Sequence, residues 1–282
     1  MARRTFIVLV LSALSFSGDT LNAQEATREE TKRTDTAKEA QGTIHRESQR
    51  LQASKSSSAR GDADQACPRI FSESGTVSPA KSSGIPSPNR QVLAWSVAIL
   101  QKNPELVRGQ VFLRNEQTGQ RETIFETRTK AGKIISTDPH FTDPTYNIFC
   151  VVDWSPDGNY LLVQEVLGHV YSDVWGDSYW VYNRMRHQRD LIALKPLKQA
   201  IENYWQKKAL DFREIRYQAL AVGWEGRKSN RVVFTAFTFN QEPAFFLGIW
   251  SVALTGRDPK LLAEKEDGLI IGRFGQIVDA PE

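Results

Sequence analysis

The stretch DWSPDGNYLLVQE, residues 153–165, decides the fold of this chain. Its centre, SPDG at 155–158, consists of residues that favour tight turns, because Pro fixes φ and Gly adopts positive φ without steric cost. A run of residues that favour β-structure follows at 160–163. The stretch therefore predicts a turn that leads into a strand. The architecture depends on whether this turn belongs to a lone hairpin or to one copy of a repeated unit.

Two other stretches have the same character, a turn followed by an apolar run. SPNRQVLAWSVAI begins at Ser87 and EGRKSNRVVFTAF begins at Glu225. With Ser155 between them, the three starts are almost evenly spaced along the chain. A fixed long period is the signature of repeated supersecondary units, so the sequence predicts an internal repeat.

The segments downstream keep the same spacing. GQVFLRN, DSYWVYN and LGIWSVA carry aromatic residues at Phe112, Trp180 and Trp250, which are separated by the same two intervals as the three starts. Each unit reads as turn, strand, connector, strand, turn and strand, and a further strand precedes the turn in the second and third units. The three predicted units span about 87–146, 147–216 and 217–282.

The motif in the second unit resembles the W-S-P-D-G-x-x-L signature of the TolB-like and WD40-like propeller repeats. The residues that carry the resemblance are Trp154, Ser155, Pro156, Asp157 and Gly158. The match is weak in the first unit, where Asn89 and Arg90 stand in place of Asp and Gly. The resemblance implies a mostly β, propeller-like domain over 67–282, with three recognisable four-stranded blades.

The predicted units differ from the blades of this family in their length and in their number. A blade usually takes ~40–45 residues and a closed ring has ~4–8 blades, whereas three longer units are recognisable here. Cryptic blades, a partial ring, a homodimer that completes the ring and a compact β-fold of another kind are the alternatives. The extra length lies in the connectors.

One connector, LKPLKQAIENYWQKKAL at 194–210, predicts an inserted helix. Pro196 suits the first turn of a helix, and Lys207 and Lys208 suit its C-terminal end. The apolar face of this helix comprises Leu197, Ile201, Tyr204 and Trp205. We expect the helix to cover the sheets, and a docking role is the alternative.

The N-terminal residues predict an exported protein. A basic pair and an apolar run at 3–14 precede a small residue, Ala23, which is the pattern of a signal peptide over 1–23. An uncleaved anchor is the alternative. Residues 24–66 contain few large apolar residues and predict a disordered low-complexity tail. We expect a periplasmic or secreted location without membrane insertion after cleavage, because no later segment has ~18 consecutive apolar residues.

Cysteines and charge narrow the classes of ligand. In an exported protein, the isolated pair Cys67 and Cys150 predicts a disulfide, with two unpaired thiols as the alternative. The two Cys and four His show no metal-ligand spacing, so we expect neither a metal site nor a cofactor. Loss of residues 1–23 changes the net charge from +3 to +2, and the basic residues are scattered. We therefore expect no nucleic-acid partner.

Two groups of residues are candidates for binding. The first group combines aromatic rings with carboxylates, which suits a glycan or a peptide; it comprises Tyr171, Asp173, Trp175 and Asp177. The second group has similar places in the three predicted turns and suits an acidic partner; it comprises Arg121, Arg189 and Arg257. The alternatives are an aromatic cover over a sheet edge and a solvated rim.

The sequence contains neither a Gly-x-Ser-x-Gly elbow nor a phosphate-binding Gly-Lys loop. We therefore expect a module that binds or scaffolds another protein of the cell envelope. A receptor for a glycan or a small ligand is one alternative. A hydrolase of envelope or extracellular polymers is another, and it requires acids that converge on one cleft, for example Asp153, Asp157, Asp173 and Asp177.

Overall fold

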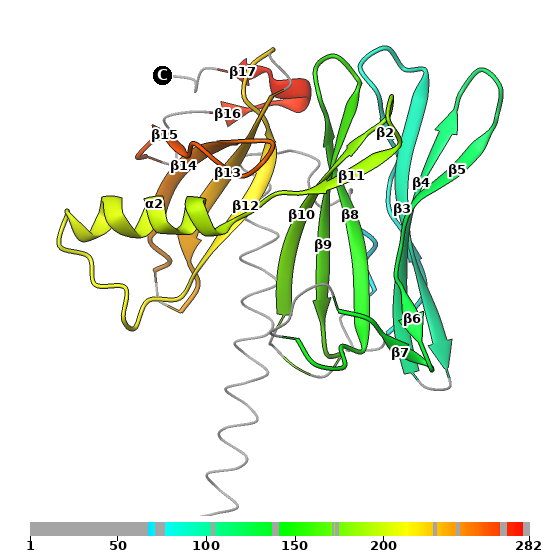
Figure 1. The fold of residues 1–282 in the computed structure, drawn as a ribbon, viewed down its shortest axis with the longest axis horizontal. Coiled ribbons are helices and arrows are strands. Elements are labelled where there is room, and N and C mark those ends of the chain that lie inside the picture. Colours follow the sequence, from blue (N-terminus) through cyan, green and yellow to red (C-terminus); the bar gives the residue numbers. More distant parts are fainter. Residues whose placement is uncertain are drawn as a thin grey trace, which may run out of the picture. The chain divides into compact units, whose positions relative to one another are not determined.

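The computed structural model of the chain describes residues 67–70, 77–102, 105–136, 141–170, 172, 175–227, 230–240, 243–265 and 270–278. The predicted signal peptide and tail lie outside the described residues, as do Tyr171 and Asp173. The described part is mostly β, which confirms the predicted fold class at this coarse level (Figure 1). Its strands form one nine-stranded sheet, one four-stranded sheet and two small two-stranded sheets, and these sheets do not close into a ring.

The first predicted unit forms an antiparallel meander. Its long strands are β3 (Val92–Lys102), β4 (Glu105–Asn115) and β5 (Arg121–Glu126). Two short strands, β1 (Ala80–Lys81) and β2 (Ile85–Pro86), both pair with β3 and supply a fourth position before the turn, which the sequence did not predict for this unit. A small hairpin of β6 (Thr129–Lys130) and β7 (Lys133–Ile134) follows.

The second and third units are four-stranded antiparallel meanders. The second consists of β8 (Tyr146–Trp154), β9 (Tyr160–Gly168), β10 (Trp175–Asn183) and β11 (Gln188–Leu191). The third consists of β12 (Tyr217–Trp224), β13 (Arg231–Thr238), β14 (Phe246–Ala253) and β15 (Lys260–Ala263). A C-terminal segment follows, with β16 (Ile270–Ile271), the 3-10 turn η3 (Arg273–Gly275) and β17 (Ile277–Val278).

Irregularities in the strand pairing recur at the period of the sequence. The register of β8 against β9 shifts at Val152, and the register of β12 against β13 shifts at Val222, the corresponding position of the third unit. The pairing of the last two strands shifts at Ile124 in the first unit and at Leu262 in the third unit. Bulges are specific features of a sheet, so their recurrence at equivalent positions supports the internal repeat.

The SPDG turn has the same hydrogen bonds as its weakly matching counterpart in the first unit. The amide of Gly158 donates to the carbonyl of Ser155 at 2.8 Å, and the amide of Arg90 donates to the carbonyl of Ser87 at 2.8 Å. The two serine hydroxyls donate to Asp157 at 2.6 Å and to Asn89 at 2.8 Å. Arg90 adopts a φ of 56°, close to the 70° of Gly158, so the two turns share a left-handed residue. Asp157 and Gly158 thus form a tight reversal.

The first two units share one sheet, whereas the resemblance implies separate blades. β4 pairs in parallel with β8 through Val107 with Tyr146 and Arg108 with Asn147. Gly109 allows this approach, because a Cβ atom at this position would lie 2.8 Å from the Cα of Ile148. The third unit has no strand pairing with the other two among the described residues.

Two hydrophobic clusters fill the spaces between the units. The cluster between the first and second units includes Ala94, Val111, Phe149, Trp154 and Val163. The cluster between the second and third units includes Leu162, Tyr179, Trp224, Phe234 and Trp250.

The predicted helix is present as α2 (Lys195–Gln206), with a proline in its first turn. It lies along the four-stranded sheet in Figure 1. Leu197 and Ile201 of α2 are buried in the cluster between the second and third units, and Tyr204 and Trp205 pack at the edge of this cluster. The helix therefore covers the sheets.

The predicted disulfide between Cys67 and Cys150 is confirmed. It fastens residues 67–70 to β8, and Ile70 packs in a small cluster with Val107 of the first unit and Tyr146 of the second. The disulfide therefore holds the start of the described chain across the junction between these units. No helix in the described part of the chain is long and apolar enough to cross a membrane.

Candidate binding surfaces

The acids that a hydrolase would require do not converge in the described structure. Asp153 is buried, and its carboxylate accepts hydrogen bonds from the amides of Trp154 and Phe274, both at 2.9 Å. Asp157 is exposed in the SPDG turn before β9, whereas Asp177 on β10 pairs with Val166 near the opposite end of β9. Since each carboxylate has a different environment, these residues give little support to a shared catalytic cleft.

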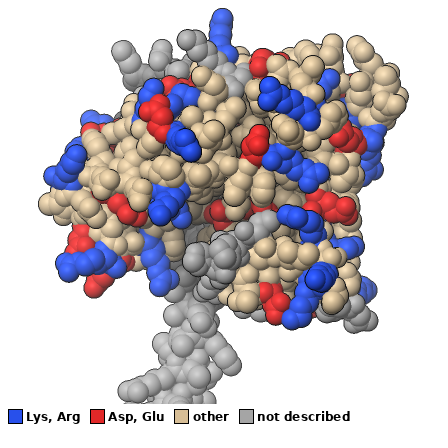
Figure 2. All heavy atoms as spheres, in the orientation of Figure 1, with Lys and Arg blue, Asp and Glu red and all other residues tan. Residues whose placement is uncertain are grey.

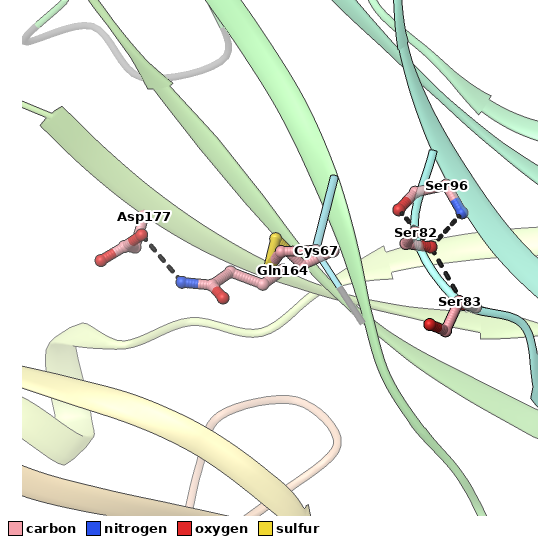
Figure 3. The surroundings of a disulfide bond; sticks show 7 residues. Cys67, Ser82, Ser83, Ser96, Gln164 and Asp177 are labelled. Atoms are coloured by element: carbon pink, nitrogen blue, oxygen red, sulfur yellow. Dashed lines mark hydrogen bonds between the residues drawn. A yellow bond between two sulfur atoms is a disulfide. The ribbon is translucent and has the colours of Figure 1, made fainter. Parts of the chain in front are cut away.

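Asp177 joins the two large sheets. Its carboxylate accepts a hydrogen bond from Gln164 of β9 at 2.9 Å and another from Gln218 of β12. Figure 3 shows Gln164 pointing at Asp177 in the neighbourhood of the disulfide. The carboxylate therefore already has two protein partners, one in each sheet, and we assign it to the joint between the second and third units.

The surroundings of Asp177 shift the pKa of its carboxyl above the ordinary value. Burial raises the pKa of this carboxyl, and the hydrogen bonds from Gln218 and Gln164, the charge of Lys198 and a hydrogen bond from the Trp175 side chain oppose the rise. Burial also raises the pKa of Tyr146, with a further contribution from the negative charge of Asp177. These groups form a polar joint with partial access to solvent.

Trp175 is only partly available to a ligand. Its ring lies 6.5 Å from the ring of Phe239, measured between centroids, and it packs against the small cluster that contains Ile70 and Tyr146. Phe239 is 48% exposed. Of the predicted group Tyr171, Asp173, Trp175 and Asp177, the described structure brings together Trp175 and Asp177, because the half-buried indole hydrogen-bonds to the carboxylate that Gln164 and Gln218 also contact.

Two of the three predicted arginines occupy equivalent positions. Arg121 at the start of β5 pairs with Arg114 of β4, and Arg189 in β11 pairs with Tyr182 of β10. The interval from Arg121 to Arg189 equals the interval from Arg114 to Tyr182, so the two arginines have the same place in their units. Each guanidinium lies over an aromatic ring, at 3.6 Å from Phe112 for Arg121 and at 5.2 Å from Phe125 for Arg189. Arg257 lies in the turn before β15, where its carbonyl accepts a hydrogen bond from Ala253.

Strand register defines a second candidate surface on the first unit. Residues paired across antiparallel strands lie on the same face of a sheet. The face of β3 and β4 that points away from the second unit, named the outer face below, carries Lys81, Leu93, Trp95, Val97, Ile99, Arg108, Gln110, Phe112, Arg114, Arg121, Thr123 and Glu126.

The opposite face of the first unit packs on the second unit. Val92, Ala94 and Val111 lie on that face and belong to the cluster between the units. In contrast, the apolar side chains of the outer face belong to none of the buried clusters that the described residues form. The outer face is thus a sheet face without a packed partner in the described part of the chain.

Cations cover the aromatic centre of the outer face. Trp95 and Phe112 stack with ring centroids 5.5 Å apart, and each is 6% exposed. The ammonium of Lys81 lies 5.2 Å from the Trp95 ring, and the guanidinium of Arg121 lies over both rings. Cation–π attraction holds the cations on the rings, and their charged ends stay exposed.

Sequence reasoning identified Arg121 in this surface and missed its neighbours. The alternation of apolar residues from Leu93 to Ile99 is visible in the sequence. The approach of Lys81 and Arg114 is not visible, because it depends on the pairing of three strands. Away from this surface, positive and negative side chains are interspersed, as the view in Figure 2 shows.

Comparisons with known proteins do not assign a function to these surfaces. No protein-family model matches the chain. No curated protein matches it either. Within the described residues, no group of three or more His, Cys, Asp and Glu side chains is placed to hold a metal ion.

Proposed function

We propose that the chain is an exported, periplasmic or secreted module that binds another protein, and that its three units are blades of an incomplete propeller. The units have equivalent bulges and turns, which supports a common blade-like origin. The first strands of neighbouring units also lie side by side, β2 beside β8 and β8 beside β12, as the inner strands of adjacent blades do. The disulfide supports an oxidising compartment.

The observation that carries the binding proposal is the outer face. It presents several cations and aliphatic side chains on a strand-built surface, over a pair of stacked aromatic rings that the cations cover. Protein interfaces are enriched in aromatic residues and arginine, so this composition supports a protein partner. The hydrolase and glycan interpretations receive less support, because Asp153 and Asp177 are both occupied by protein donors.

Cross-linking in intact cells of the producing organism tests this function. The full chain carries an affinity tag, and complexes are purified under denaturing conditions after cross-linking. We expect one reproducible protein partner in amounts comparable to the bait. The complex is then reconstituted from purified components and measured by size-exclusion chromatography with light scattering. Recovery of the chain without a protein partner would contradict the proposal and favour a receptor for a small ligand.

A further inference from the structure

We propose that the outer face binds an acidic segment of its protein partner, with the carboxylates on Lys81, Arg114 and Arg121 and apolar side chains on the surface between them. This inference rests on the proposed function and specifies the surface and the chemistry of the partner.

The charge of the outer face is predominantly positive. Its four cations, Lys81, Arg108, Arg114 and Arg121, share the face with Glu126, which accepts a hydrogen bond from Gln110 at 2.8 Å, and Glu116 beside the end of β4 is a second acid. Arg114 forms a surface ion pair with Glu116 at 2.8 Å. Among the described residues, no carboxylate forms an ion pair with Lys81 or Arg121. These two cations therefore remain available to an anionic partner.

A shallow hollow gives the surface its shape. It is lined by two cations, Lys81 and Arg114, by the apolar side chains of Leu93 and Trp95, and by Gly84. A hollow lined by two cations and apolar side chains suits the end of a Glu or Asp side chain, with the carboxylate on Lys81 and on Arg114, where it would share the guanidinium with Glu116. Ile99, which is 36% exposed, extends the apolar surface along β3.

The same charges disfavour a second copy of the chain as the occupant. In a symmetric dimer the same patch of both subunits is juxtaposed, so the cations Lys81, Arg114 and Arg121 of one subunit would face the same cationic patch of the other. Like charges brought together at an interface oppose association. An acidic partner of different sequence satisfies the cations, and we therefore assign the face to such a partner.

Fluorescence anisotropy with defined peptides tests the inference directly. The probe is a short labelled peptide of Glu, Leu and Tyr, and the comparison probe has Lys in place of every Glu. We expect the acidic probe to bind the full chain and the basic probe to bind at least about tenfold more weakly, because the charges of the face attract one and repel the other. Equal binding of the two probes, or no binding of the acidic probe, would overturn the inference.

A matched pair of variants locates the binding. The triple variant Lys81→Gln, Arg114→Gln and Arg121→Gln should reduce affinity for the acidic probe about tenfold or more. The control variant Lys133→Gln, Lys207→Gln and Arg213→Gln removes the same charge at exposed positions elsewhere and should change affinity less than about twofold. Equal losses in the two variants would show that net charge, not the outer face, attracts the probe.

Two further readouts separate the possible failures. Lys81→Gln alone leaves the stacked rings and strands intact and should weaken binding of the acidic probe about threefold. This single variant tests the inference even if the triple variant fails to fold. In the cellular cross-linking experiment, equal recovery of the natural partner by the triple variant would refute the acidic-segment inference and leave the proposed function standing. Absence of a partner for the unmodified chain would refute the function itself.

Discussion

The junction between the first and second units differs from the junction between the second and third units. At the first junction β4 and β8 pair directly, so one sheet continues through both units, and the disulfide fastens residues 67–70 across it. At the second junction two separate sheets meet through side chains, with α2 along one side and the Asp177 carboxylate between Gln164 and Gln218. Units with the same strand order thus pack on their neighbours in different ways, and Gly109 allows the close approach of β4 to β8 at the first junction.

Two equivalent tryptophans, one at each junction, differ in their hydrogen bonding. Trp154 and Trp224 end equivalent strands of the second and third units, and both are fully buried, the first in the cluster at the first junction and the second in the cluster at the second. The indole N–H of Trp154 donates to the carbonyl of Ile85 at 3.0 Å. In the described structure the indole N–H of Trp224 has no hydrogen-bond partner. At these tryptophans, the first junction therefore has an indole hydrogen bond that the second junction lacks.

The largest expected effect concerns the disulfide at the first junction. The double variant Cys67→Ser and Cys150→Ser should lose about 4–5 kcal/mol of unfolding free energy in the chain-entropy model, because the two cysteines are separated by 83 positions in the sequence. Urea denaturation of the full chain measures this loss. The single variants give the control, since each should be as unstable as the double variant. A loss below about 1 kcal/mol would show that the bond does not hold the junction.

The matched tryptophan variants should give a smaller and unequal loss. Trp154→Phe removes packing volume and leaves the buried carbonyl of Ile85 without its donor, whereas Trp224→Phe removes volume alone. We expect Trp154→Phe to cost about 1–3 kcal/mol more than Trp224→Phe in urea denaturation, which is the cost of an unsatisfied buried polar group. Equal losses would remove the proposed difference between the junctions.

The equivalent turns should respond in opposite directions. Gly158→Ala places a Cβ atom at a φ of 70°, where its nearest contact, Pro88, lies at an ordinary 3.5 Å, so the cost is conformational and about 1 kcal/mol. Arg90→Gly relieves the left-handed strain at a φ of 56° and should be neutral or stabilising by under about 1 kcal/mol. Thermal unfolding of the two variants checks this, and destabilisation by both would argue against equivalent turns.

The smallest expected effect is the pH dependence at the second junction. Because burial raises the folded-state pKa of Asp177 above its ordinary 3.8, the protonated form stabilises the fold. This contribution is fully present below pH 3.8 and is lost as the pH rises through the folded-state pKa. Relative to the unmodified chain, Asp177→Asn should therefore gain stability as the pH increases from about 4 towards about 7. Melting temperatures over this range provide the measurement.

Asp211→Asn is the matched control for this pH series. A hydrogen bond from Arg213 lowers the pKa of Asp211, so the carboxylate of this exposed residue stabilises the fold above pH 3.8 and loses that contribution as the pH falls. The control difference should therefore have the opposite sign and be small, because solvent screens it. The same trend in both variants would contradict the assignment to Asp177.

The long strands, the helix and the disulfide were predictable because each has a local or periodic signal. The regular spacing of Ser87, Ser155 and Glu225 identifies the strands and turns, and α2 follows from an apolar face with a proline at its start. The short strands β1 and β2 escaped prediction because their residues, such as Ile85 and Pro86, form too short a run.

The binding surfaces were less predictable because they depend on contacts between distant residues. Gln164 and Gln218 resemble ordinary surface amides in the sequence, and only the packing of two sheets brings them to Asp177. Likewise, Lys81 and Arg121 reach Trp95 from two other strands. Sequence alone therefore predicted the long strands and the helix, but not the contacts of Asp177 or the composition of the outer face.

Site-specific photo-cross-linking tests the central claim most directly. A photoreactive amino acid replaces either Ile99 on the outer face or Met185, which is 75% exposed in the turn after β10, and the full chain is irradiated in the producing cells. We predict a cross-link to an acidic segment of a partner protein from position 99 and none from position 185. A partner cross-linked from position 185 but not from position 99 would contradict binding through the outer face.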